Sequence, residues 1–181
     1  MPSTRSFARW TATSLLMLLL ISCGREDGAG SNGSATGQYA YGTKISFAQA
    51  GRGAAFQASG WSTPEPQFTW TEGDTAVFTI QAPATETGVA LKVRASGFMN
   101  PPELTAQPVE VLVNDRKIAD WQVGPLSEHS ALIPQELVKQ GGLLTFTFRI
   151  PKATSPKAAG VAEDPRVLGI CVHEVELRKV G

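Results

Sequence analysis

The sequence has no excess of basic residues, because 16 lysine and arginine side chains are balanced by 16 aspartate and glutamate side chains. Nucleic-acid-binding proteins concentrate positive charge to displace the counterions around phosphates, so no nucleic-acid partner is expected. Histidine and cysteine are scarce, with two of each. The sequence also lacks a metal-ligand spacing, a Gly-x-Ser-x-Gly nucleophile motif and a phosphate-binding loop. We therefore expect a protein that is not an enzyme and that carries no cofactor.

Long apolar runs are also missing, apart from residues 15–21 (LLMLLLI). This run is too short for a transmembrane helix, which needs about 20 apolar residues. Arg5 and Arg9 precede it, and the first acidic residue is Glu26. A basic start followed by a short apolar run is typical of a secretory signal peptide.

The segment after this run, Leu20-Ile21-Ser22-Cys23, resembles the lipobox of bacterial lipoproteins. The resemblance implies that residues 1–22 are a signal peptide and that Cys23 becomes the acylated N-terminus, which anchors the chain to a membrane. Several acyl chains bind a bilayer firmly, whereas one binds reversibly. Gly24 in place of aspartate favours an outer-membrane location in the bacterial envelope, facing the periplasm or the surface. The alternative is a secreted protein whose Cys23 is unmodified.

Residues 24–40 are mostly Gly, Ser, Ala and Thr, a composition that is typical of a flexible tether. We therefore place a linker at residues 23–42 and a folded domain at residues 43–181. If Cys23 is lipidated, Cys171 has no partner for an intramolecular disulfide. Because it lies in an apolar, strand-like run, we expect Cys171 to be a buried and unreactive thiol.

Many turn-forming residues, with 18 Gly and 12 Pro, divide the domain into short segments. In LLTFTFRI, Leu144, Phe146 and Phe148 alternate with polar residues, as in a half-buried antiparallel strand. The sequence therefore predicts an all-β antiparallel sandwich with one short helical connector at residues 134–142. The predicted strands are residues 44–48, 54–59, 75–81, 89–96, 109–113, 117–123, 130–133, 143–150 and 167–177.

Two local features are predicted within these strands. Asn114 and Asp115 separate two alternating runs, and both residue types tolerate the positive φ of a tight hairpin turn. Trp121, in the second run, is expected in the core. Near the C-terminus, Ile170 and Val175 fall out of phase with each other, which predicts a β-bulge near His173.

A series of short motifs resembles a family of bacterial β-sandwich domains. These galactose-binding-like or carbohydrate-binding-module-like domains are appended to glycosyltransferases and membrane proteins of exopolysaccharide and O-antigen synthesis. The resemblance spans residues 43–178 and implies a jelly-roll fold and non-catalytic glycan binding. The motifs are Gly60-Trp61-Ser62, Pro64-Glu65, Phe68-Thr69-Trp70-Thr71, Gly73, Asn114-Asp115, Phe146, Pro151, Ser155-Pro156, Asp164-Pro165-Arg166 and Leu168-Gly169-Ile170.

Five residues in these motifs are candidates for glycan binding. Trp61 and Trp70 would present indole faces to sugar rings, but large aromatic side chains also fill sandwich cores. Glu65, Asp164 and Arg166 would form directional hydrogen bonds with sugar hydroxyls. The alternative for these three is an internal brace, in which Arg166 pairs with a carboxylate and orders the long loop before the last strand.

Two functions therefore remain open. The first is a lipid-anchored module that binds a polysaccharide or other glycan at the envelope. The second is a structural or protein-interaction subunit of a polysaccharide synthesis or export apparatus. Exposed indoles beside polar groups favour the first, and a flat apolar patch favours the second. Sandwiches of this kind often hold a structural calcium ion, but no Asp-x-Asp cluster supports one here, and no metal ligands are predicted.

Mass spectrometry of the protein purified from bacterial envelopes should find acyl chains on Cys23 as the N-terminal residue. The same sample should contain an unmodified Cys171. A mature chain with an unmodified Cys23 contradicts the predicted anchor.

Overall fold

The computed structural model describes residues 39–181. The predicted signal peptide, Cys23 and the linker up to residue 38 lie outside the described residues. Within the described part, no helix has the length and apolar character needed to cross a membrane.

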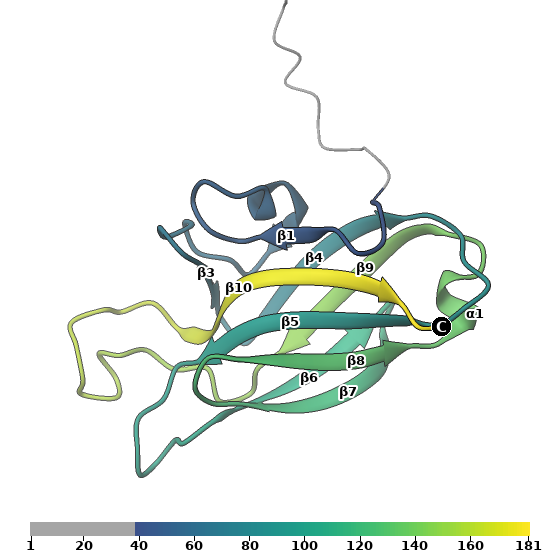
Figure 1. Cartoon of the computed structure of the whole chain (residues 1–181). Helices are drawn as coiled ribbons and strands as arrows, with labels where there is room; N and C mark the ends of the chain where they lie inside the picture. The colour runs from purple at the N-terminus through teal and green to yellow at the C-terminus, as the bar shows by residue number, and fades with distance from the viewer. Residues whose placement is uncertain (1–38) are drawn as a thin grey trace, which may run out of the picture. The chain divides into compact units, whose positions relative to one another are not determined.

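Two antiparallel sheets of five strands each stack face to face, which confirms the predicted β-sandwich (Figure 1). We call them the front sheet and the back sheet. The front sheet has the order β1 (Lys44–Ser46), β10 (Leu168–Lys179), β5 (Val89–Gly97) and β8 (Ser127–Ile133), and β3 (Thr69–Glu72) also pairs with β10. The back sheet has the order β2 (Gln57–Ser59), β4 (Thr75–Ala82), β9 (Gly142–Arg149), β6 (Gln107–Val113) and β7 (Arg116–Val123).

The core lies between the two sheets and follows the alternation seen in the sequence. In β9, Leu144, Phe146 and Phe148 are buried, as predicted. Phe146 lies opposite Phe78 of β4, and the two rings stack with centroids 4.6 Å apart. Stacked aromatic pairs of this kind add to the stability gained from apolar burial, so the β4–β9 pair forms the centre of the core.

The predicted hairpin and bulge are both present. Asn114 and Asp115 have φ values of 48° and 64° in the turn between β6 and β7. The register between β10 and β5 shifts between Val172 and Glu174, so the bulge lies at His173. Trp121 is buried, with 7% of its surface exposed, and its indole donates a hydrogen bond to the Ser130 carbonyl at 3.1 Å.

Residues 54–59 do not form one continuous strand, which corrects the sequence prediction. A 3₁₀ helix, η1 (Gly53–Phe56), comes first, and only β2 is extended. The backbone at Gly53 packs closely against Phe47, since a Cβ at position 53 would lie 2.7 Å from the Phe47 Cα. The predicted connector at residues 134–142 contains a single helical turn, α1 (Gln135–Val138), which is followed by Gly141 at a φ of 67°.

Strand β3 was not predicted, because its pattern is inverted. Its inward residues are Thr69 and Thr71, and the large Trp70 between them points to the outer face. Burying a hydroxyl is costly unless it is hydrogen-bonded. Both hydroxyls are paired, because Thr69 donates to the Phe47 carbonyl at 2.5 Å and Thr71 accepts from the Ile170 amide at 2.9 Å.

The last residues of the predicted linker pack against the sandwich. Tyr39 is buried, its amide donates to the Gln81 carbonyl at 2.7 Å, and its hydroxyl accepts from the Leu177 amide at 2.9 Å. The Tyr41 hydroxyl donates to the Pro83 carbonyl at 2.8 Å. The folded domain therefore includes residues 39–42, which bond to β4 of the back sheet and to β10 of the front sheet.

Replacing Phe146 with alanine should lower the free energy of unfolding by about 3 to 5 kcal/mol, because it leaves a cavity at the centre of the core. The matched control is Leu143→Ala on the same strand, where the side chain is 58% exposed. Chemical denaturation should find a loss of less than about 0.5 kcal/mol for the control. Equal losses for the two variants would contradict the assigned core.

Candidate functional site

Trp61 packs into the core side of the domain. Its ring centroid lies 5.1 Å from that of Phe47 and 6.3 Å from that of Phe78. Its indole donates a hydrogen bond to the Val77 carbonyl at 2.7 Å. The side chain is half-buried and its polar atom is used internally, which matches the core alternative for this residue.

Trp70 lies on the outer face of the front sheet. The buried Thr69 and Thr71 on either side of it fix the orientation of β3, so the indole points away from the core. Trp70 is in register with Cys171 of β10. The two tryptophans that flank the polar stretch thus lie on different sides of the structure. Of the two, Trp70 has its indole on an outer surface, where it can contact a ligand.

Phe68 and His173 join Trp70 in what we call the aromatic cluster. The Phe68 ring meets Trp70 edge-on at a centroid distance of 5.8 Å and lies 5.1 Å from the His173 ring. All three side chains are half-buried. Burial lowers the pKa of His173, and the nearby positive charge of Arg94 lowers it further, so the imidazole is neutral at pH 7.

Glu65, Asp164 and Arg166 come together, and we call them the clasp. The Arg166 guanidinium forms two parallel contacts with Asp164, Nε to Oδ1 at 3.1 Å and Nη2 to Oδ2 at 2.6 Å. Its Nη1 lies 3.5 Å from Glu65 Oε1. These contacts have the geometry of the brace alternative, because they connect the loop before β10 to the loop before β3.

The charge state of the clasp follows from these contacts. Hydrogen bonds from the Arg166 side chain and amide lower the pKa of the Asp164 carboxyl group. A carboxyl group with a lowered pKa keeps its charge at neutral pH, and its contribution to stability is lost only as the pH falls through that pKa. Asp164 is therefore ionised at neutral pH, as its charged hydrogen bonds with Arg166 require.

Cys171 lies beneath the aromatic cluster. Its Sγ is 2.9 Å from the Ser96 hydroxyl and 3.9 Å from His173 Nε2. Burial raises the pKa of the thiol, and only 3% of the residue is exposed. This confirms the expected buried thiol and leaves little thiolate at neutral pH. In the described part of the chain, no group of three His, Cys, Asp or Glu residues is arranged to hold a metal ion.

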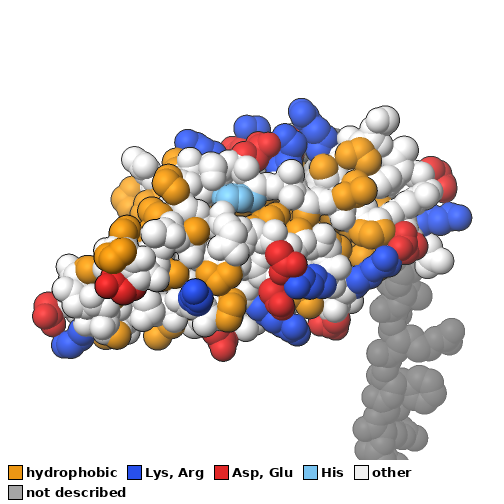
Figure 2. All heavy atoms as spheres, turned by 90° about the horizontal axis from the view of Figure 1, so that it is seen from below, with side chains coloured by type: hydrophobic (Ala, Val, Ile, Leu, Met, Phe, Trp, Pro, Cys, Tyr) orange, Lys and Arg blue, Asp and Glu red, His pale blue; other side chains and the backbone are white. Residues whose placement is uncertain are grey.

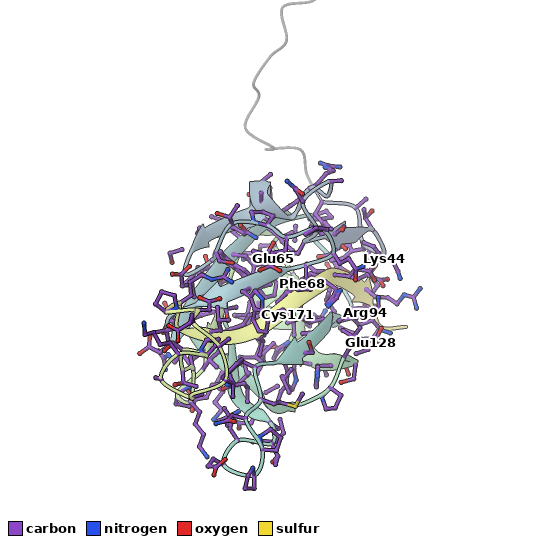
Figure 3. All side chains as sticks on the ribbon, turned by 90° about the vertical axis from the view of Figure 1, so that its left-hand side faces the viewer. Lys44, Glu65, Phe68, Arg94, Glu128 and Cys171 are labelled. Atoms are coloured by element: carbon purple, nitrogen blue, oxygen red, sulfur yellow. The ribbon has the colours of Figure 1, made fainter. Side chains whose placement is uncertain are left out.

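The clasp and the aromatic cluster are neighbours on one surface. The Glu65 amide donates to the Phe68 carbonyl at 2.8 Å. One turn of the chain therefore connects Glu65 of the clasp to Phe68 of the aromatic cluster. Figure 3 shows Glu65, Phe68 and Cys171 together, with Arg94 next to them. Sequence reasoning found Trp70 and the clasp but missed Phe68 and His173, although the Phe-Thr-Trp alternation placed Phe68 on the same face as Trp70.

Comparisons with known proteins report a similar fold. No protein-family model matches the chain, and no curated protein does so. The CBM36-1 domain of a multidomain xylanase from the hindgut metagenome of Trinervitermes trinervoides is 9% identical, with a TM-score of 0.40, over 77% of this chain and 98% of that one.

Two other solved structures are similar at the same level. The CBM22-1 xylan-binding domain from Paenibacillus barcinonensis is 10% identical, with a TM-score of 0.46, over 76% of this chain and 93% of that one. The C-terminal CBM6 of a Zobellia galactanivorans laminarinase is 5% identical, with a TM-score of 0.42, over 76% of this chain and 98% of that one.

The two tryptophans should respond differently to truncation. Trp61→Ala should lower the free energy of unfolding by about 2 to 4 kcal/mol, because it removes core contacts and the hydrogen bond to the Val77 carbonyl. Trp70→Ala should cost about 1 kcal/mol, because the outer face is solvated. Chemical denaturation with tryptophan-independent detection measures both. A larger loss for Trp70→Ala would contradict the assigned positions.

Proposed function

We propose that this chain is a non-catalytic glycan-binding module whose binding surface is formed by the aromatic cluster and the clasp. The observation that carries the proposal is the position of Trp70. Its indole faces outward, contacts Phe68, and lies on the same surface as the three charged side chains of the clasp. Aromatic faces pack against the C–H groups of a pyranose ring. A small number of placed polar groups then orients the ligand.

The clasp suits this role because it is already ordered. Glu65 and Asp164 accept hydrogen bonds from sugar hydroxyls, and each carboxylate has lone pairs that Arg166 does not use. Side chains that are held before the ligand arrives lose little entropy on binding. The internal brace and the binding role are therefore compatible, since the brace positions the groups that the ligand meets.

The lipidated Cys23 would tether this surface to the bacterial envelope, where polysaccharides are synthesised, exported and retained. This part of the proposal rests on the lipobox resemblance and on the composition of the linker. Gly24 in place of aspartate favours an outer-membrane position, and the module would then face glycans of the periplasm or the cell surface. Other envelope proteins remain as partners if the module acts within a polysaccharide export apparatus.

The protein-interaction alternative has weaker support. A docking face needs a contiguous apolar patch. In the described part of the chain, large exposed apolar residues occur on β8, on β9, in loops and at the C-terminus. Figure 2 shows acidic and basic side chains between the hydrophobic ones on the face that it displays. We therefore favour the glycan-binding function over the protein-interaction function.

Glycan-array binding by the purified protein should be lost in Trp70→Ala and weakened about tenfold in Phe68→Ala, because both substitutions remove a stacking surface. The matched control is Trp121→Phe, which keeps a buried ring at a distant site and should bind as the wild type does. Unchanged binding by Trp70→Ala, with its fold verified by circular dichroism, would contradict the proposed surface.

A further inference from the structure

The outer face of the front sheet carries charged side chains beside the aromatic cluster. Most of the positive side chains are neutralised by a neighbouring carboxylate, as expected for a solvated sheet face with cross-strand pairs. Three ion pairs lie on this face: Lys44 Nζ to Glu174 Oε1 at 2.9 Å, Lys92 Nζ to Glu128 Oε1 at 2.7 Å, and Arg178 Nε to Glu176 Oε1 at 3.2 Å.

Arg94 is the exception on this face. Its backbone lies between Glu128 of β8 and Glu174 of β10 in the strand register. Those two carboxylates pair with Lys92 and Lys44 instead, and Arg94 forms no ion pair with any residue in the range 39–181. Its side chain is exposed. The face therefore presents one uncompensated guanidinium.

This guanidinium lies next to the aromatic cluster. Arg94 and Ser96 share the outer side of β5, and the Ser96 hydroxyl contacts Cys171 beneath the cluster at 2.9 Å. The bulge at His173 brings the imidazole beside Arg94, whose charge contributes to the lowered pKa of that ring after the larger effect of burial. Figure 3 shows Arg94 beside Cys171, with Glu128 close to Arg94.

We propose that the glycan bound at this surface is acidic, with a uronic acid unit whose ring packs on the aromatic cluster and whose carboxylate pairs with Arg94. The proposal rests on the proposed glycan-binding function and adds the class of sugar. A guanidinium presents two parallel N–H donors that match the two oxygens of a carboxylate. Arg166 does not fill this role, because Asp164 and Glu65 already occupy its donors.

The test compares matched acidic and neutral polymers. Affinities of the wild-type protein are measured by isothermal titration calorimetry for polygalacturonate and its fully methyl-esterified form, and for alginate and its propylene glycol ester. Esterification removes the charge and keeps the ring. We expect at least one acidic polymer to bind about tenfold more tightly than its ester, and added salt to reduce this difference.

The variant Arg94→Gln should bind the acidic polymer and its ester equally, because it retains hydrogen-bonding capacity without the charge. The control is Arg149→Gln on the back sheet, whose guanidinium lies 3.8 Å from Glu110 and is remote from the cluster. It should keep the wild-type preference. A preference that survives in Arg94→Gln overturns the proposal.

Failure of this proposal differs from failure of the proposed function. If neutral glycans bind in a Trp70-dependent manner and the acidic polymers bind no better than their esters, the acidic specificity is wrong and the glycan-binding surface stands. If neither neutral nor acidic glycans bind, or if Trp70→Ala leaves binding unchanged, the glycan-binding surface itself is wrong and the acidic specificity falls with it.

Discussion

In a two-layer sandwich, successive residues of a strand point to opposite faces, so the phase of each strand decides which side chains build the core and which meet a ligand. Strand β3 depends on this constraint most directly. Two buried threonine hydroxyls hold it against Phe47 and Ile170, and the intervening Trp70 is thereby directed outward. A shift of one residue would bury the indole and expose both hydroxyls. The position of the aromatic cluster follows from this phase.

The fold was predictable wherever apolar residues alternate strongly. Phe146 and Phe148 define the phase of β9 without ambiguity. The Asn114-Asp115 pair defines the β6–β7 hairpin, because both residues accept a positive φ. The sequence misled where polar residues face inward or where steric contacts shape the chain. Thr69 and Thr71 look like surface residues until their hydrogen-bond partners are known. The close packing of the Gly53 backbone against Phe47 joins residues that no local sequence pattern connects.

The candidate site was predictable in part for the same reason. The sequence separation of Glu65 and Arg166 hides their proximity, but complementary charge and a long loop were sufficient to suggest a brace. Trp61 and Trp70 were not separable, since the phase of the segment between them was unknown. Arg94 could not be identified as a candidate from the sequence, because its role depends on the ion pairs that neighbouring residues form. Lys44 and Lys92 take the two carboxylates that flank it in the sheet, and only the register shows this.

The central claim is that ligand recognition occurs on the outer face of the front sheet, over the aromatic cluster. The most direct measurement is the change in NMR chemical shifts on titration with a glycan that binds. The account predicts changed chemical shifts for the Trp70 indole and for the side chains of Phe68, His173 and Arg94. The signals of the Trp61 and Trp121 indoles should not change. Shifts confined to Trp61, to Trp121 or to the back sheet would contradict it.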